Sequence, residues 1–492
     1  MADVILSIDQ GTTGSTVMLI DTACRVLARG YREFRQIYPQ PGWVEHNPED
    51  IWDSVLAAIS EAFKQGGVKP GDVKAIGITN QRETALMWNR RTGGAYHNAI
   101  VWQCRRTSEV IRGLKEKGLE PLFVKKTGLI LDPYFTGTKY QWQLDHVPGL
   151  RDEAAEGRVA AGTVDSFLVW RLTHGAAHVT DASNASRTLL MDLATQVWDP
   201  ELCGLLNVPE NILPKIVPCA AVYGHTKKVP GLPDGIPISG MAGDQQAALF
   251  GQACFAPGEG KCTFGTGAFL LMNTGETPVA SENGLLTTVA WKIGDKTVFA
   301  LEGSVFMAGA TVQWLRDGLG IIKKASEVEA LASSVGDSGG VVLVPAFTGL
   351  GAPHWKPDAR GVLSGLTRGT TAAHIARAAL EGIALQNVEI LKAMEADSGR
   401  ELVRLKVDGG AAANNLLMQM QADFLGRAIV RPDMLETTGL GAAFLAGLGA
   451  GLFSGTDEIT KVWRQDREFT PQMGEEQRAQ TLAAWDAAVA KA

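Results

Sequence analysis

Three short strings rich in glycine and threonine or aspartate follow strand-like runs, at positions where a phosphate group could be held. They are Asp9–Ser15, Gly265–Gly267 and Asp408–Gly410. Glycine lets the backbone approach a ligand, backbone N–H groups and threonine hydroxyls bond phosphate oxygens, and a carboxylate such as that of Asp9 can hold a hydrated Mg²⁺. Taken alone, a string such as Asp9–Ser15 is more often an ordinary polar turn. Their occurrence in both halves of the chain favours a nucleotide bound from two sides.

Two polar clusters also follow strand-like runs, and their chemistry suits a small polyol. In Asn80–Glu83 an arginine and a glutamate stand together, and such a pair can grip vicinal hydroxyls from both sides. In Asp244–Gln246 the carboxylate, near Mg²⁺, could accept a hydroxyl proton. The carbon side of the polyol could be lined by Trp102, Tyr134 and Phe269. Taken singly, the charged pair also fits a surface ion pair and each aromatic residue also fits a core.

Other catalytic patterns find little support. The chain has no G-x-x-x-x-G-K-[ST] string, and no G-x-G-x-x-G follows a strand, which argues against a P-loop and against a dinucleotide fold. Gly336–Gly340 and Thr371–His374 resemble the nucleophile and histidine strings of serine proteases. The order of these two strings is reversed, and the histidine falls in a long helical pattern. We therefore interpret them as a loop and a helix start.

The composition favours a small-molecule partner over nucleic acid or anionic lipid. In 492 residues, 46 basic against 53 acidic side chains give a net charge of −7, so no global positive field attracts nucleic acid. The six cysteines are scattered without metal-ligand spacing. The longest apolar stretch, Ala442–Phe453, is too short and glycine-rich to span a bilayer, and the first residues do not resemble a signal peptide. We expect a cytoplasmic protein with reduced thiols and no stable membrane insertion.

These candidate residues must be positioned by α/β elements that recur in each half. The first half is predicted to contain three strands, a helix that starts at Asn47 and a further strand. The predicted strands are Val4–Ile8, Val17–Ile20, Val26–Tyr31 and Val73–Thr79. The second half shows a related order, with strands at Lys261–Phe264, Ala268–Asn273 and Val298–Glu302 and a helix at Val305–Leu315.

Proline and glycine interrupt the pattern near Phe255–Gly260, and we place a domain boundary there. The predicted domains are residues 1–254, carrying the polyol site and the first phosphate loop, and residues 255–492, carrying most of the nucleotide site. Later elements of the second domain are predicted as a helix, a strand and a helix at Ala372–Met394, Leu402–Val407 and Asn414–Phe424. The sequence thus predicts two α/β domains facing each other across a cleft.

Several longer motifs make the chain similar to the FGGY carbohydrate kinases. The resemblance extends from Ile5 to about Gly449, and its motifs are typical of the members that act on glycerol. The matching strings are Asp9–Thr13, Ile76–Thr84, Val101–Thr107, Tyr134–Lys139, Met241–Ala248 and Gly361–Glu381.

This resemblance implies two actin-like, ribonuclease-H-like domains and transfer of the ATP γ-phosphoryl group to glycerol, giving sn-glycerol 3-phosphate. The family's glycerol contacts match Arg82, Glu83, Tyr134, Asp244 and Gln245, with Trp102 and Phe269 as apolar walls. Asp244 matches the general base, and Asp9 with Asp244 matches the acidic pair near Mg²⁺. The nucleotide-binding positions are expected at Thr12, Thr13, Gly14, Thr266, Gly309, Gln313, Gly410 and Asn414.

The implied partners are glycerol and ATP, with no nucleic acid, and a homo-oligomer is expected. A chaperone or filament ATPase of the same fold class is the main alternative, but no peptide-binding domain follows the second half. Dependence of ATP turnover on glycerol separates the two. One departure concerns phosphate binding, because the family's first loop usually continues Ser-Ser-Arg, whereas Gly14-Ser15-Thr16 stands here.

A second departure generates a prediction about regulation. In enteric-type relatives an arginine-bearing loop binds fructose 1,6-bisphosphate, but the corresponding Val229–Ile236 has no arginine. A site for two phosphate groups needs Arg or Lys, and only Lys227 and Lys228 are near. Activity titrated with this sugar phosphate to millimolar concentration should stay flat. A saturable drop that disappears when both lysines are replaced would contradict the prediction.

Overall fold

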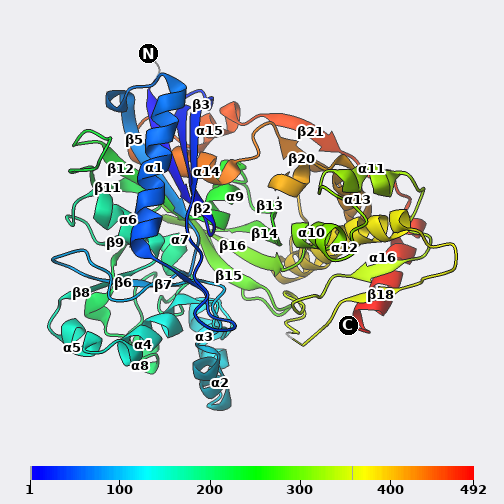
Figure 1. Cartoon of the computed structure of the whole chain (residues 1–492), viewed down its shortest axis with the longest axis horizontal. Coiled ribbons are helices and arrows are strands. Elements are labelled where there is room, and N and C mark those ends of the chain that lie inside the picture. Colours follow the sequence, from blue (N-terminus) through cyan, green and yellow to red (C-terminus); the bar gives the residue numbers. More distant parts are fainter. Residues whose placement is uncertain (1–2, 357) are drawn as a thin grey trace.

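One sheet connects the two halves of the molecule (Figure 1). The computed structural model describes residues 3–356 and 358–492, and in these residues 13 strands form a single sheet. The strands of its first half, in spatial order, are β3 (Val26–Glu33), β2 (Gly14–Asp21), β1 (Val4–Gln10), β5 (Val73–Asn80), β12 (Pro237–Gly243) and β11 (Ala220–His225). The order continues through β15 (Leu286–Ile293), β16 (Lys296–Val305), β14 (Ala268–Gly275), β13 (Glu259–Phe264), β19 (Arg404–Asp408), β20 (Ile429–Pro432) and β21 (Gln465–Phe469).

Helices cover both halves of this sheet, and four two-stranded pairs complete the described fold. The helices of the first half are α1 (Pro48–Gly66), α2 (Ser108–Glu116), α3 (Glu120–Thr127), α4 (Thr136–His146), α5 (Leu150–Ala155), α6 (Val164–Leu172), α7 (Ala182–Ala185), α8 (Pro200–Leu205) and α9 (Asp244–Gly251). Those of the second are α10 (Gly309–Asp317), α11 (Glu327–Ser333), α12 (Ala372–Ser398), α13 (Asn415–Leu425), α14 (Thr437–Gly449), α15 (Thr456–Val462) and α16 (Glu475–Val489). The short pairs are β4 (Glu45–His46) with β7 (Ala99–Ile100), β6 (Leu86–Asn89) with β8 (Val159–Gly162), β9 (Val179–Asp181) with β10 (Lys215–Val217), and β17 (Val342–Val344) with β18 (Val362–Ser364).

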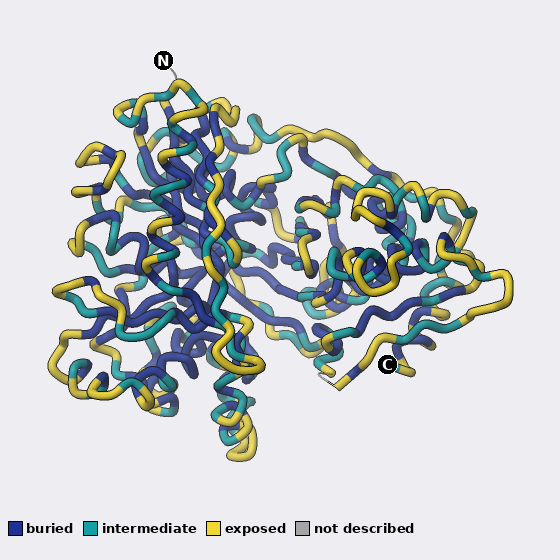
Figure 2. The backbone as a smooth tube through the Cα atoms, viewed as in Figure 1, coloured by how far each residue is buried: buried dark blue, intermediate teal, exposed yellow. Residues whose placement is uncertain are grey.

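The predicted elements of the first half are confirmed, and local chemistry explains them. Strand β1 is an almost continuous apolar run buried between antiparallel β2 and parallel β5. Helix α1 begins where the Asn47 side chain accepts a hydrogen bond from the N–H of Glu49, with Pro48 at the first helical position. Figure 2 shows buried backbone through the middle of both halves, while exposed residues lie on outer helices, on loops and on the edge strands β3 and β21.

The second half follows the predicted order with one error of position. The predicted helix Val305–Leu315 begins too early, because β16 continues to Val305 and the helix starts at Gly309. Val305 pairs with Ala268 across the sheet, and this strand pairing outweighs the helical periodicity of the apolar residues. Strands β15, β20 and β21 of the sheet were not predicted. The other predicted strands and helices of this half are present.

Helix α14 returns from the second half to cover the sheet of the first (Figure 1). It packs against β1, β5, β12 and α9, and its carbonyls at Gly439 and Ala446 accept hydrogen bonds from Ser7 and Ser239. The apolar stretch Ala442–Phe453 is therefore explained by packing. None of the described helices combines the length and the apolar composition that a membrane-spanning helix needs.

Because α14 packs closely, adding one methyl group at a glycine of this helix should strongly lower the free energy of unfolding. A Cβ at Gly441 would lie 1.8 Å from the carbonyl oxygen of Ala247, whereas one at the helical Gly113 in α2 would meet nothing within 4 Å. We expect Gly441→Ala to lower the free energy of unfolding by about 1–3 kcal/mol or more, through overpacking. Gly113→Ala should raise it by up to about 1 kcal/mol. Denaturant unfolding measures both, and equal effects would contradict the packing.

Candidate active site

The carboxyl ends of three parallel strands bring the two predicted polar clusters to the first phosphate loop. In the sheet register Gln10 of β1 lies opposite Asn80 of β5, and Asn80 lies opposite Gly243 of β12. Asp9, at the end of β1, and Asp244, directly after β12, are therefore neighbours at one sheet edge, as is the segment that follows Asn80. Ligands of open α/β sheets bind at such edges.

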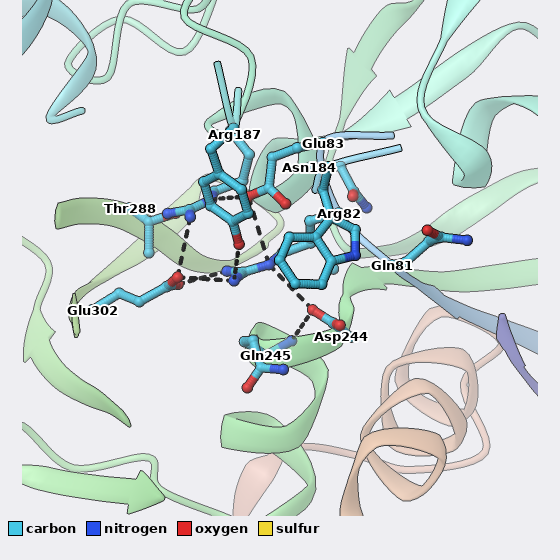
Figure 3. A network of polar contacts seen from close by, with 12 residues as sticks. Gln81, Arg82, Glu83, Asn184, Arg187, Asp244, Gln245, Thr288 and Glu302 are labelled. Carbon is cyan, nitrogen blue, oxygen red and sulfur yellow. Dashed lines mark hydrogen bonds and ion pairs between the residues drawn. The ribbon is translucent and has the colours of Figure 1, made fainter. Parts of the chain in front are cut away.

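Arg82 and Glu83 belong to a closed ring of four alternating charges, shown in Figure 3. Glu302 of β16 accepts two hydrogen bonds from Arg82, at 2.5 and 2.8 Å. It accepts a third, of 3.0 Å, from Arg187, whose Nε donates to Glu83 at 2.6 Å. Arg82 Nε lies 3.8 Å from Glu83 Oε1 and completes the ring.

All four side chains of the ring are almost fully buried, yet the ring is charge-balanced. Burial alone would raise the pKa of Glu302, but the guanidinium groups of Arg187 and Arg82 outweigh it and hold that pKa at about 2. Both carboxylate oxygens of Glu302 are hydrogen-bonded, which is the condition under which a buried charge is tolerated. The ring therefore holds the Arg82 and Glu83 side chains in one arrangement.

The backbone at Glu83 is also held in an uncommon conformation. Its φ angle is 58°, and the N–H of Thr84 donates to the carbonyl of Arg82 at 2.7 Å across a three-residue turn. A non-glycine residue in this region costs on the order of 1–3 kcal/mol and persists only where its surroundings enforce it. Lys139 contributes to this, because its buried Nζ donates to the carbonyl of Glu83 at 3.1 Å and to that of Tyr134. Burial lowers the pKa of Lys139 to about 7.

Asp244 begins helix α9 and remains accessible, with 31% of its side chain exposed. Its Oδ1 accepts the N–H of Gln245 at 2.7 Å and lies 3.1 Å from Arg82 Nε. Oδ2 has no hydrogen-bond partner among the described residues. Burial raises the pKa of the Asp244 carboxyl, and the positive charges of Arg82 and Lys261 oppose that rise. Lys261 also donates to the side-chain oxygen of Gln245.

Two of the three predicted aromatic walls are in contact. Trp102 and Tyr134 pack edge to face with ring centroids 5.6 Å apart. Trp102 also donates from Nε1 to Thr12 Oγ1 at 3.0 Å, which joins this wall to the first phosphate loop. Phe269 lies opposite Ser304 across the sheet, and residues two apart share a face, so Phe269 is on the same face as Glu302.

Most of the predicted nucleotide positions in the second half gather around the ends of β13 and β19. The carbonyl of Thr266 accepts hydrogen bonds from the N–H groups of Ala308 and Ala310, at 2.9 and 3.0 Å. These bonds hold the turn at Thr266 against the start of α10. A Cβ at Gly309 would lie 2.6 Å from the carbonyl of Gly265, so this approach requires glycine.

The remaining positions divide between the two halves. The turn containing Gly410 follows β19, which pairs with β13, and Asn414 caps α13 by accepting the N–H of Leu417 at 2.9 Å. Gln313 is exposed on α10, without a hydrogen bond to the other predicted residues. Thr13 is exposed in the first loop, while Gly14 is buried. No hydrogen bond among the described residues connects the first loop to the turn at Thr266.

The donor set at Asp9 fits a Mg²⁺ ion that shares its coordination with phosphate. Burial and then the charge of Asp244 raise the pKa of Asp9 to about 7, so a nearby cation would relieve the repulsion between these carboxylates. No group of three or more His, Cys, Asp or Glu residues within the described ranges could hold a metal by itself. Mg²⁺ commonly uses one or two carboxylates together with substrate phosphates and water.

Sequence reasoning did not identify several residues of the site. Arg187, Glu302 and Lys261 were not predicted as site residues, and Lys139 and Gln246 were named only as parts of motifs. Glu302 had a usable signal, because it directly follows the apolar run Val298–Leu301 of a predicted strand. A carboxylate buried in such a strand is costly unless it is paired, so a partner could have been expected. His374 lies in the first turn of helix α12 and bonds its N-cap Thr371, which confirms the interpretation of Thr371–His374 as a helix start.

Comparisons with known proteins agree with this geometry. Residues 4–251 match the N-terminal domain of the FGGY family of carbohydrate kinases, and residues 260–450 match its C-terminal domain. The chain is 57% identical to a glycerol kinase of Myxococcus xanthus, over 100% of this chain and 99% of that protein. It is 54% identical to one of Bdellovibrio bacteriovorus, over 99% and 98% respectively.

Solved structures have the same fold. The glycerol kinase of Plasmodium falciparum with ADP superposes with a TM-score of 0.93 at 38% identity, covering 100% of this chain and 98% of that one. A xylulose kinase of Lactobacillus acidophilus reaches 0.88 at 22% identity, over 99% and 97%, which supports the fold alone. The fold is therefore the two-domain, actin-like kinase fold, and the chain belongs to the FGGY family of carbohydrate kinases.

Proposed function

We propose that this chain transfers the γ-phosphoryl group of ATP to glycerol and forms sn-glycerol 3-phosphate. The main observation behind the proposal is that two carboxylate oxygens of the site can still accept hydrogen bonds from a ligand. Glu83 and Asp244 each bind arginine through one carboxylate oxygen, while their other oxygens, Oε2 and Oδ2, have no hydrogen-bond partner among the described residues. The curated relatives named as glycerol kinases support it, since they are 54–57% identical over the full chain.

The donors of Arg82 are almost all committed to the protein. Its five N–H groups face Glu302 twice, Gln246 at 3.1 Å, Asp244 at 3.1 Å and the Tyr134 hydroxyl at 3.4 Å. The last of these bonds is long and therefore weak. A glycerol hydroxyl that replaced it would gain the Arg82 donor and could donate its own proton to Glu83 Oε2.

Phosphoryl transfer mainly requires positioning and neutralisation, and the remaining groups have those roles. Asp244 Oδ2 accepts the proton of the attacking hydroxyl, and Gln245 orients the same part of glycerol. Trp102, Tyr134 and Phe269 line its carbon side. Residues 1–254 then act as the polyol-binding half and residues 255–492 as the half that binds most of the nucleotide.

The nucleotide is bound by turns from both halves. Thr12, Thr13 and Gly14 face its phosphates from one side and Thr266 with Gly309 from the other. The rest of the nucleotide is held by Gln313, Gly410 and Asn414. Asp9 and Asp244 would hold Mg²⁺, which when bound neutralises charge on the phosphates. Closure around the substrates excludes water that would hydrolyse ATP.

A direct assay tests this activity. ADP release should depend on the added acceptor, with glycerol far more effective than xylulose, and dihydroxyacetone should show how much the pocket tolerates a carbonyl. ATP turnover that is independent of any polyol would favour an ATPase of the same fold class.

One prediction from this proposal concerns Asp244 as the general base. Asp244→Asn keeps the side-chain shape but cannot accept the proton, so kcat at saturating glycerol should fall by about 10²–10⁴ while the fold persists. Asp199→Asn is the matched control, because Asp199 also accepts a helix N-terminal N–H, in α8, and pairs with Lys126 at 2.6 Å. Its kcat should remain normal. Near-normal turnover of Asp244→Asn would remove Asp244 from this role.

Another prediction from this proposal concerns recognition of glycerol by Glu83. Glu83→Ala removes an acceptor and leaves buried donors unpaired, at a cost of about 1–3 kcal/mol, so glycerol KM should rise about tenfold or more. ATP KM should hardly change. Glu153→Ala is the control, since Glu153 pairs with Arg158 on the outer helix α5. A higher ATP KM with unchanged glycerol KM would show that the pocket is assigned wrongly.

A further inference from the structure

Glu302 is a charged residue in a buried part of the sheet, where its strand neighbours are apolar. On β16 it lies opposite Leu271 of β14 and Leu286 of β15, and it follows the buried Leu301. Its side chain is 1% exposed. A buried ion cluster is often no more stable than apolar residues of similar volume, so its presence needs an explanation other than stability.

The contacts of Glu302 determine how Arg82 is oriented. Its two oxygens bind both terminal nitrogens of Arg82, at 2.5 and 2.8 Å, which fixes the plane of the guanidinium. With that plane fixed, the third nitrogen of Arg82, Nε, lies 3.1 Å from Asp244 Oδ1. Arg82 therefore faces Asp244 because Glu302 holds its other end.

The same carboxylate also reaches Glu83 through a second arginine. Arg187 donates from Nη2 to Glu302 at 3.0 Å and from Nε to Glu83 at 2.6 Å. Its side chain is 0% exposed and packs over the rings of Tyr134 and Phe135. This arginine therefore takes one oxygen of Glu83, which leaves Oε2 as the acceptor available to a ligand.

We propose that Glu302 is a positioning residue for polyol recognition, which acts from the second half of the sheet by orienting Arg82 directly and Glu83 through Arg187. The inference rests on the proposed phosphorylation of glycerol. Glu302 does not touch the substrate in this arrangement. It determines which donor and which acceptor the first half presents to glycerol.

The test replaces Glu302 in the full-length chain and separates the two substrates. In Glu302→Gln an amide NH₂ group replaces one carboxylate oxygen. Because this group is itself a donor, it cannot accept a hydrogen bond from a guanidinium, and Arg82 loses its orientation. Glycerol KM should rise about tenfold or more, ATP KM should stay within about twofold, and kcat should fall by a smaller factor than KM rises. Glu302→Asp keeps the charge, and its glycerol KM should lie between those of the wild type and the Gln variant.

Asp21→Asn serves as the control for loss of a buried carboxylate. Asp21 is 1% exposed and pairs with Arg25 at 2.7 Å, but it lies opposite Val4, at the far end of β1 from Asp9. It should lower the melting temperature without changing glycerol KM. If glycerol KM of Glu302→Gln stayed within twofold of wild type, or if both KM values rose together, the proposal would be wrong.

A glycerol-bound structure of the wild-type protein tests the inference without any variant. The two Arg82–Glu302 hydrogen bonds should persist with glycerol in place, and Arg187 should still bind Glu83. Arg82 turned away from Glu302 onto the ligand would overturn the positioning role. Absence of glycerol-dependent turnover in the wild type would instead contradict the proposed function itself.

Discussion

Four buried charges, on Arg82, Glu302, Arg187 and Glu83, are the interaction on which the rest of the site depends. Removing such charges from water costs several kcal/mol per ion, and only close pairing with full hydrogen bonding recovers that cost. The ring achieves the close pairing by alternating sign around a closed path, while Arg187 Nη1 and Glu83 Oε2 have no hydrogen-bond partner among the described residues. Asp244 stands just outside the ring, where Arg82 stabilises its charge while part of its carboxylate stays exposed.

The sheet explains how residues so far apart in the chain reach this ring. The parallel register of β1, β5 and β12 brings three loops to one edge, and β16 extends from the second half toward the same place. Helix α14 then covers β1, β5 and β12, although it comes late in the chain, at Thr437–Gly449. The two halves are thus joined by backbone pairing, by helix packing and by the Glu302 contacts with Arg82 and Arg187.

The site also contains features that a fold selected for stability alone would avoid. Glu83 has a positive φ angle, and Asp9 lies close enough to Asp244 for their charges to interact. Lys139 is buried and forms no ion pair with a carboxylate among the described residues. Each feature has a local compensation, such as the contact of Lys139 with two carbonyls at the strained turn. Such strain is typical of functional sites, where the surrounding fold maintains a geometry that binds a ligand.

The amino-acid sequence by itself determined the α/β class, eight of the 13 strands of the described sheet, four of the helices, and the polar clusters at the strand ends. Apolar periodicity, capping residues and glycine turns act locally, so they are readable in one dimension. The helix start at Gly309 was misplaced because pairing of Val305 with Ala268 is a long-range effect. Arg187 and Glu302 became part of the site only in the tertiary structure, because 220 residues separate Arg82 from Glu302. No local sequence pattern encodes which buried arginine pairs with which buried glutamate. Strand register and the order of the strands in the sheet decide these pairs.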